Sequence, residues 1–145
     1  MVNFFLKNDD NDLKCDVLKL QNSNVTKQVK QMKLNRLKNN DDVTVVITCC
    51  NRPHLLKRTV DSFIKFNTYP IKEFIIIEDS ENYGVNDFLK TDYPNERWNL
   101  IYNECNIGQV ASIDKAYEYV STEYIFHCEE DWEFIKHSFI EESLK

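Results

Sequence analysis

From residue 43 onward, short apolar runs alternate with segments of helical periodicity, and this alternation constrains the fold more than any other feature. The apolar runs, several of them rich in β-branched residues, cover 43–50, 72–80, 98–104 and 123–128. Runs of this kind are typical of strands that are covered on both faces. The intervening periodicity predicts helices at about 52–66, 85–90 and 108–121, with a last helix at 136–144. The sequence therefore predicts an α/β domain with a mostly parallel sheet of about four strands and helices on both faces.

Polar side chains gather where each predicted strand ends. Because the carboxyl ends of parallel strands meet at one edge of a sheet, and ligands of such sheets bind there, these side chains are the candidate site. They are Thr48, Asn51 and Arg52 after the first strand, Glu78 and Asp79 after the second, Asn103 to Gly108 after the third, and Glu129, Glu130 and Asp131 after the fourth.

The three adjacent carboxylates Glu129, Glu130 and Asp131 are the most unusual of these groups, because neighbouring negative charges repel one another. One interpretation is a solvated acidic turn. The other is a site for a hard divalent cation, which binds carboxylate oxygens together with phosphate oxygens. Their position directly after a buried strand favours the cation site.

The other strand ends allow two interpretations each. Asp79 either contacts a nucleoside base or ribose, or forms with Glu78 an N-cap pair for the following helix. Arg52 pairs with a phosphate or forms a surface salt bridge. Gly108 either lets backbone approach a ligand closely or serves a plain turn.

Composition and charge exclude several classes of protein. Residues 43–145 carry 10 Lys/Arg and 18 Asp/Glu, a net charge of −8, which argues against general nucleic-acid binding. No apolar run is long enough for a transmembrane helix, and five cysteines without CxxC spacing argue against a disulfide framework or zinc ribbon. With no signal-peptide pattern at the N-terminus, the chain is expected to be cytoplasmic.

Residues 1–42 form a second region, an N-terminal arm with a net charge of +2. Apolar residues in 23–38 hold roughly one helical face, and five basic residues without an acidic one accompany them. This basic amphipathic helix is expected either to pack on the main body or to lie on an anionic membrane or partner surface, with disorder as the third alternative. The predicted domain division is therefore 1–42 and 43–145.

The motifs VTVVITCCNRP, EFIIIEDS, NECNIGQVASIDKA and YIFHCEEDWEF, taken in order, resemble the nucleotide-sugar half of a GT-A glycosyltransferase of the family 2 type. The resemblance covers about residues 43–135 and implies a Rossmann-like half domain with strand order 3-2-1-4. It implies a nucleotide diphosphate sugar as donor, Mn²⁺ or Mg²⁺ as cofactor, and an acceptor that is a glycan or a protein. It implies donor contacts from Thr48, Asn51, Arg52, Glu78, Asp79, Gly108, Asp114 and Glu130, and metal contacts from Asp131 and Glu129.

The sequence also departs from the family pattern. Ile113 stands where the family often has Arg, with Lys115 as a substitute, and the metal motif is EED rather than DxD. Only 14 residues follow Asp131, whereas family members normally continue with further strands, the acceptor site and, in inverting enzymes, a catalytic base. The catalytic base is therefore unknown, and the domain is expected to be truncated after the DxD-like motif.

Without the further strands of the family, the fourth predicted strand has no neighbour on one side. The fourth strand would be an edge with unpaired backbone groups. We expect the N-terminal arm, a second copy of the chain or a separate polypeptide to cover it.

Two functions of different classes follow. The first is a metal-dependent glycosyltransferase, or its donor-binding half. The second is a non-catalytic remnant that binds a nucleotide or a partner. A nucleotidyltransferase is a third, disfavoured because the sequence has no Gly-rich phosphate loop.

Overall fold

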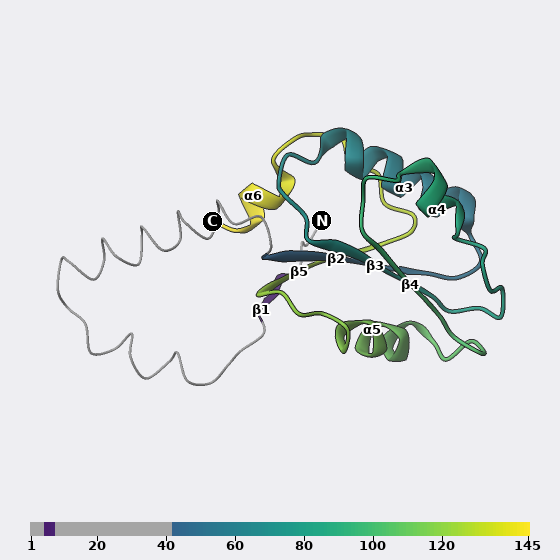
Figure 1. Cartoon of the computed structure of the whole chain (residues 1–145). Helices are drawn as coiled ribbons and strands as arrows, with labels where there is room; N and C mark the ends of the chain where they lie inside the picture. Colours follow the sequence, from purple (N-terminus) through teal and green to yellow (C-terminus); the bar gives the residue numbers. More distant parts are fainter. Residues whose placement is uncertain (1–4, 8–41) are drawn as a thin grey trace, which may run out of the picture.

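The computed structural model describes residues 5–7 and 42–145, which form one sheet with helices on both faces (Figure 1). The strands are β1 (Phe5–Lys7), β2 (Val43–Cys49), β3 (Glu73–Glu78), β4 (Trp98–Tyr102) and β5 (Tyr124–Glu129). The helices are α3 (Pro53–Phe66), α4 (Phe88–Asp92), α5 (Gln109–Tyr117) and α6 (Phe139–Ser143). The strand order is β1-β5-β2-β3-β4, in which β2 to β5 are parallel and β1 runs antiparallel to β5.

The predicted four-strand parallel sheet of order 3-2-1-4 is confirmed, because its strands correspond to β4, β3, β2 and β5 in space. Its helices and strands also lie close to their predicted ranges. The helix predicted at 85–90 begins at Phe88 as α4, and the helix predicted at 108–121 ends at Tyr117 as α5. The basic helix predicted in the N-terminal arm lies outside the described residues.

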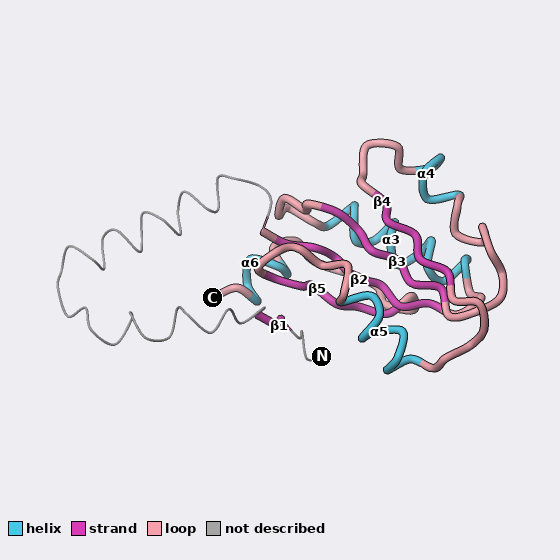
Figure 2. Tube along the Cα trace, turned by 60° about the horizontal axis from the view of Figure 1, so that its bottom comes forward, coloured by secondary structure: helices cyan, strands magenta, loops and turns pink. Residues whose placement is uncertain are grey.

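The sheet separates two cores, and alternation along the strands decides which side chain enters which core. On one face, α3, α4 and α6 lie over Val45, Ile47, Cys49, Phe74, Ile76, Phe126 and Cys128 (Figures 1 and 2). On the other face, α5 lies over Val46, Ile75, Ile77 and Ile125. Each strand thus alternates between a face covered by α3, here called the α3 face, and a face covered by α5, the α5 face.

Phe63 of α3 is the centre of the larger core. Its ring is fully buried and makes edge contacts with Phe74, Phe126, Phe134 and Phe139, at centroid distances of 5.1–5.8 Å. Burial of a side chain of this size contributes about 2 to 3 kcal/mol to stability. Two of the four partners follow β5 in sequence, so the chain beyond the acidic motif returns over the α3 face.

The helix α5 packs differently from the sequence prediction. We expected Val110, Ile113, Tyr117 and Val120 to face inward. Tyr117 and Val120 do pack against the core on this face, but the buried residues of α5 are Ser112 and Ala116, and Val110 is 73% exposed. The two small side chains, four residues apart, form the face that meets the sheet, while larger residues flank it.

The outer edge of β5 is covered in part by the N-terminal arm, one of the three covers that the sequence predicted. Phe5, Leu6 and Lys7 pair with Phe126, Ile125 and Tyr124 respectively. The strand β1 thus satisfies backbone groups along the first half of β5.

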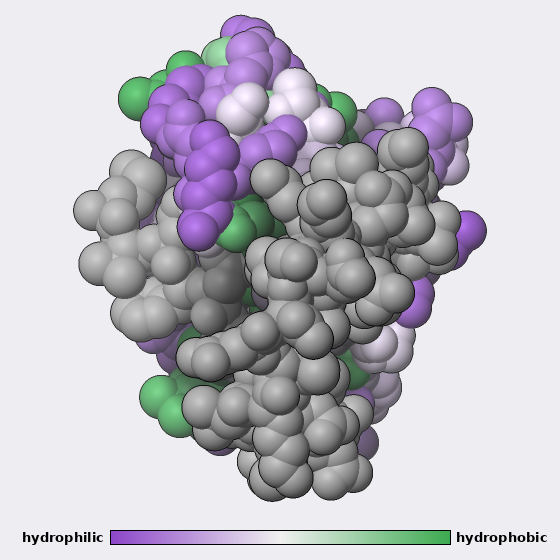
Figure 3. All heavy atoms as spheres, turned by 90° about the vertical axis from the view of Figure 1, so that its left-hand side faces the viewer, coloured by the Kyte–Doolittle hydropathy of each residue, from purple (hydrophilic) through white to green (hydrophobic). Residues whose placement is uncertain are grey.

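Within the described residues, no helix combines the length and apolarity needed to cross a membrane. Among the coloured residues on the face shown in Figure 3, hydrophilic areas predominate and the hydrophobic areas are smaller. The exposed large hydrophobic residues are Tyr83, Ile107, Val110, Tyr119 and Ile135.

Candidate functional site

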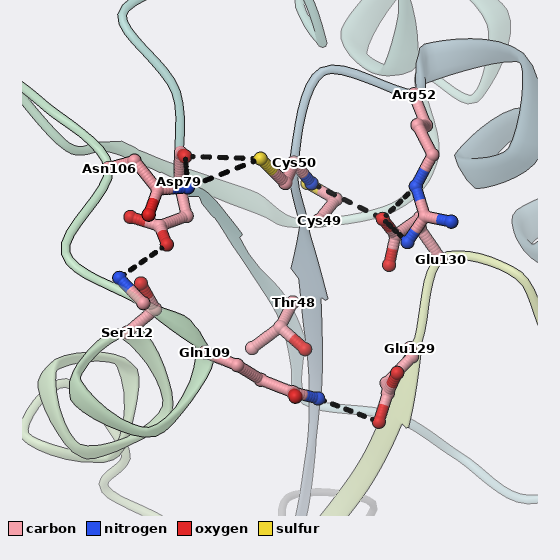
Figure 4. Close-up of a pocket in the computed structure, with 11 residues that line it drawn as sticks. Thr48, Cys49, Cys50, Arg52, Asp79, Asn106, Gln109, Ser112, Glu129 and Glu130 are labelled. Carbon is pink, nitrogen blue, oxygen red and sulfur yellow. Dashed lines mark hydrogen bonds and ion pairs between the residues drawn. The ribbon is translucent and has the colours of Figure 1, made fainter.

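A cleft of about 280 Å³ lies at the carboxyl ends of β2, β3 and β5, where the sequence predicted the site. Backbone hydrogen bonds from Asp79 N to Cys49 O (2.8 Å) and from Glu130 N to Thr48 O (3.2 Å) continue the strand register into its wall. The cleft is lined by Thr48, Cys49, Cys50, Arg52, Asp79, Asn106, Gly108, Gln109, Ser112, Glu129 and Glu130 (Figure 4).

Asp79 is the most constrained carboxylate on the α5 side of the cleft. Its side chain accepts hydrogen bonds from the backbone N–H groups of Ile107 (2.8 Å) and Gly108 (2.9 Å) and from the Asn103 amide (2.9 Å). Burial alone would raise the pKa of Asp79, but these hydrogen bonds outweigh it and lower the pKa below its usual range. Asp79 is therefore a charged group that holds the turn before α5.

A second row of side chains orients the partners of Asp79. Lys115 donates to the Asn103 side-chain oxygen over 2.7 Å, and Asn103 donates to Ser112 Oγ over 2.9 Å as well as to Asp79. Because an ammonium only donates, the oxygen of the Asn103 amide must face Lys115 and its NH₂ must face Asp79. Lys115 thus acts beneath the cleft, through Asn103.

Gly108 has φ +89° and ψ 154°, a conformation that is essentially restricted to glycine. Its N–H points at Asp79 and its Cα faces open space, since an added Cβ would meet no atom within 4 Å. Gly108 therefore forms a turn that borders the cleft.

Thr48 and Glu129 complete the α5 side. Thr48 Oγ1 lies 3.5 Å from His127 Nε2, and His127 Nδ1 lies 2.8 Å from the Tyr117 hydroxyl of α5. Burial lowers the pKa of His127, which favours its neutral form. Glu129 accepts a 2.8 Å hydrogen bond from Gln109 at the start of α5.

Glu78 is on the α3 face and is fully buried. Its carboxylate accepts hydrogen bonds from the Asn51 N–H (2.5 Å), the Ser80 hydroxyl (2.7 Å), the Asn86 amide (2.8 Å) and the Cys49 thiol (3.2 Å). Burial raises the pKa of that thiol, and the charge of Glu78 raises it further. Glu78 therefore supports the loop between β2 and α3 and does not line the cleft.

Glu130 is the second buried carboxylate of the α3 face. Its Oε1 accepts from Arg52 Nε (2.8 Å) and from the Cys50 N–H (3.3 Å), and it lies 2.5 Å from Arg52 Nη2 (Figure 4). The hydrogen bond and charge of Glu130 raise the pKa of Arg52. Arg52 and the acidic motif, far apart in sequence, are thus one charged unit.

Asp131 follows at the exposed end of the acidic motif, with Oδ2 3.9 Å from Arg52 Nη1. Among residues 42–145, no three His, Cys, Asp or Glu side chains gather closely enough to hold a metal ion by themselves. Glu129, which lines the cleft, and Asp131, which lies beside Arg52, offer the carboxylate oxygens that Mg²⁺ or Mn²⁺ prefers, with phosphate oxygens and water left to complete the shell.

The structure brings together six of the predicted site residues in the cleft lining: Thr48, Arg52, Asp79, Gly108, Glu129 and Glu130. Asp131 lies beside Arg52. Asn51 lies in the loop between β2 and α3 with φ +54°, and its N–H donates to Glu78. Asp114 is exposed on α5 and does not line the cleft, because the residues of α5 that turn toward the sheet are Ser112 and Ala116.

Three lining residues were not predicted from the sequence. Cys50 donates to the Asp79 carbonyl oxygen over 3.3 Å, and Gln109 binds Glu129. Cys49 lies beneath them on the α3 face. Cys49 ends β2, Cys50 follows it and Gln109 begins α5, and these positions at the ends of elements are the signal that the sequence offers for them.

Solved structures with the same fold include nucleotide-bound ones. The mannosyltransferase PcManGT of Pyrobaculum calidifontis, in complex with GDP-Man and Mn²⁺, is 17% identical, with a TM-score of 0.54 over 61% of this chain and 27% of that chain. Residues 1–349 of S. aureus TarS in complex with UDP-GlcNAc are 15% identical, with a TM-score of 0.59 over 71% of this chain and 30% of that chain. The complex of TarS 1–349 with UDP is 13% identical, with a TM-score of 0.60 over 71% of this chain and 31% of that chain.

This chain therefore spans less than a third of each of these matched chains. At such low identity the likeness shows the fold alone. No curated protein matches the sequence significantly. The sequence model of glycosyl transferase family 2, however, matches residues 44–145, nearly all of the described body. The chain belongs to glycosyl transferase family 2, and its sheet is the N-terminal part of a GT-A fold.

Proposed function

We propose that this chain binds a nucleotide diphosphate sugar in the cleft, together with a divalent cation, as a glycosyltransferase or its donor-binding half. The observation that carries the proposal is the convergence of Asp79, Arg52 and the Glu129–Asp131 carboxylates at one cleft of a family 2 fold. This cleft provides opposite charges for the different parts of such a donor. The proposed location is the cytoplasm, and the acceptor is a glycan or a protein.

The nucleoside is assigned to the α5 side of the cleft. Thr48, Asp79 and Gly108 lie there, and the turn held by Asp79 presents backbone and small side chains to a planar base or a ribose. Within the protein, Asp79 Oδ1 accepts two hydrogen bonds and Oδ2 accepts one, so Oδ2 is the oxygen with a lone-pair direction left for the ligand.

The diphosphate is assigned to the opposite side, between Arg52 and the acidic motif. A guanidinium binds phosphate oxygens through two parallel N–H groups, and Arg52 lines the cleft. Glu129 and Asp131 would hold the cation, which supplies charge neutralisation for the diphosphate leaving group when bound. The chain's own residues thus bind and orient the donor.

The neighbours' ligands support this assignment without identifying the donor. PcManGT was solved with GDP-Man and Mn²⁺, and TarS with UDP and UDP-GlcNAc. These two donors differ in base and sugar, so both guanosine and uridine nucleotides need to be tested.

The proposal is tested by calorimetric titration of UDP, GDP and their sugars with and without Mn²⁺, followed by an assay of donor hydrolysis. We expect binding to require the cation and to weaken in Asp131→Ala. The matched control is Glu133→Ala, which removes an exposed carboxylate two residues further along the chain.

Each outcome has a definite meaning. Cation-dependent binding with hydrolysis that Asp131→Ala abolishes supports an enzyme, whereas binding without hydrolysis supports a donor-binding half. If none of the nucleotides binds in the presence of Mn²⁺ or Mg²⁺, the proposal is wrong and a partner-binding role replaces it.

A further inference from the structure

Glu129 and Glu130 are neighbours in sequence but point toward opposite faces of the sheet, as alternation along a strand requires. Glu129 lies on the α5 face and contacts Gln109, while Glu130 lies on the α3 face and contacts Arg52 (Figure 4). The acidic motif is therefore divided between two different environments, and its middle residue has a different partner from the other two.

The backbone around Glu130 is fixed in this orientation. Its N–H donates to Thr48 O of β2 (3.2 Å), and its carbonyl oxygen accepts from the Thr59 hydroxyl of α3 (2.5 Å). Trp132 O lies 2.7 Å from the same Thr59 hydroxyl, which shares its one hydrogen between the two carbonyl oxygens. These two backbone contacts hold Glu130 between β2 and α3 and so fix the direction of its Cα–Cβ bond.

Arg52 is oriented by this carboxylate. Its Nε and Nη2 both engage Glu130 Oε1, at 2.8 and 2.5 Å, which leaves Nη1 as the outer nitrogen, 3.9 Å from Asp131 Oδ2. The side chain of Arg52 is 46% exposed, whereas that of Glu130 is only 4% exposed. The inner edge of the guanidinium is thus buried against Glu130, and its outer edge borders the cleft.

From this geometry we infer that Glu130 is a positioning residue, which holds Arg52 toward the diphosphate of the donor and is not itself a metal ligand. The inference rests on the proposed function and assigns separate tasks within the acidic motif. Glu129 in the cleft lining and Asp131 beside Arg52 remain for the cation.

Burial explains why Arg52 should stay in place when a donor binds. If phosphate drew Arg52 away, Glu130 would be left as a buried carboxylate with only the 3.3 Å contact from the Cys50 N–H at its Oε1. Leaving a buried charge without its partner is strongly unfavourable. Phosphate is therefore expected to meet the outer edge of a guanidinium that remains bound to Glu130.

The test compares diphosphate and monophosphate binding in variants of the whole chain. The dissociation constants of UDP and UMP, or of GDP and GMP if the protein prefers guanosine, are measured with Mn²⁺ for wild type, Glu130→Gln, Arg52→Gln and the double variant. Arg52→Lys is a further variant, because it keeps the positive charge but loses the two-nitrogen contact with Glu130. Arg58→Gln is the control, since Arg58 is exposed and donates to the Asp131 backbone oxygen at 3.5 Å, with no hydrogen bond or ion pair to Glu130 among the described residues.

We expect Glu130→Gln, Arg52→Gln and Arg52→Lys each to weaken diphosphate binding about tenfold, the size of one lost charge-assisted bond. Monophosphate binding should change by less than about twofold. The double variant should be no weaker than Arg52→Gln alone, because Glu130 acts only through Arg52. The concentration of Mn²⁺ needed for half-maximal UDP binding should be unchanged in Glu130→Gln.

Two results would overturn the inference while leaving the proposed function intact. One is a Glu130→Gln variant that needs more Mn²⁺ and adds its loss to that of Arg52→Gln, as a metal ligand would. The other is an unchanged preference for diphosphate in Arg52→Lys, which also decides the question if Glu130→Gln does not fold. If wild type binds no nucleotide, the proposed function fails and this inference fails with it.

Discussion

The two faces of the sheet use their carboxylates differently at the rim of the cleft. On the α5 face, Asp79 and Glu129 lie in the cleft wall, where their partners are backbone N–H groups and amides. On the α3 face, Glu78 and Glu130 are buried and hold the loop that carries Arg52. The comparison shows that adjacent acidic residues at a strand end have different roles, because alternation sends them to different faces.

This difference has a consequence for stability and binding. Removing an α3-face carboxylate leaves several buried donors without an acceptor, so the free energy of unfolding should fall most in these variants. Removing an α5-face group disturbs the wall of the cleft. In these variants the loss of ligand affinity should be larger, compared with the loss in free energy of unfolding, than in the α3-face variants. The following four changes test this comparison, beginning with the one of largest expected effect.

Glu78→Ala should have the largest effect on stability. It removes the acceptor of four hydrogen bonds at a fully buried position, and we expect the free energy of unfolding to fall by about 4 kcal/mol. Urea unfolding followed by circular dichroism measures this. A loss as small as that of an exposed carboxylate such as Glu133→Ala would show that Glu78 does not support the loop.

Asp79→Asn should lower the free energy of unfolding by about 3 kcal/mol at neutral pH, because an amide cannot accept from Gly108 and Ile107 as a carboxylate does. The pKa of Asp79 is lower in the folded protein than in the unfolded chain. Its stabilisation is therefore full above the unfolded pKa, about 4, and is lost as the pH falls through the lowered folded pKa.

Unfolding titrations between pH 7 and pH 2 in wild type and Asp79→Asn separate this contribution from those of other carboxylates. The difference in unfolding free energy between the two proteins should shrink as the pH falls. A difference that is constant over this range would mean that the charge of Asp79 does not stabilise the turn.

Gly108→Ala should lower the free energy of unfolding by about 2 kcal/mol, because φ +89° with ψ 154° is strained for any residue with a Cβ. No atom lies within 4 Å of the added Cβ, so backbone strain is the only cause expected. Gly84→Ala is an instructive comparison, since its Cβ would also meet Asp87 Oδ2 at 3.2 Å. Equal stability of Gly108→Ala and wild type in urea unfolding would argue against this turn conformation.

Lys115→Met should have the smallest effect, lowering the free energy of unfolding by about 1 kcal/mol, because it leaves the side-chain oxygen of buried Asn103 without its donor. If Lys115 acts through Asn103 on Asp79, nucleotide binding should weaken more in Lys115→Met than in Lys72→Met. Lys72 contacts Ser121 on the exposed surface and serves as the control. Equal nucleotide affinity of the two variants would show that Lys115 does not contribute to nucleotide binding.

The sequence was sufficient to predict the parallel sheet and the rim on which Asp79, Arg52 and Glu129 meet. Buried strands of a parallel sheet are apolar on both faces, so their pattern does not show which face adjoins the cleft. That is why Glu78 and Asp79 were both predicted to contact the donor, and why Glu129 and Glu130 were both placed at the ligand. Once the contacts of one residue in a strand are known, alternation along the strand shows on which face of the sheet every other side chain of that strand lies.

Two further features lay beyond sequence reasoning for physical reasons. The strand β1 is three residues long and is specified by pairing with the edge of β5, which no local pattern predicts. Val110 was expected to be buried by helical periodicity, but the small residues Ser112 and Ala116 allow α5 to approach the sheet on a different face. Tertiary packing, not hydrophobicity alone, decided that helix's orientation.

The most direct test of the account is to locate a bound nucleotide on the protein by NMR. Titration of ¹⁵N-labelled protein with UDP or GDP and Mg²⁺ should shift the amide signals of residues 48–52, Asp79, 107–109 and 129–131. Replacing Mg²⁺ by paramagnetic Mn²⁺ should then broaden the signals of 129–131 most strongly. Unchanged signals at these positions, or shifts confined to another surface, would contradict the assignment of this cleft as the donor site.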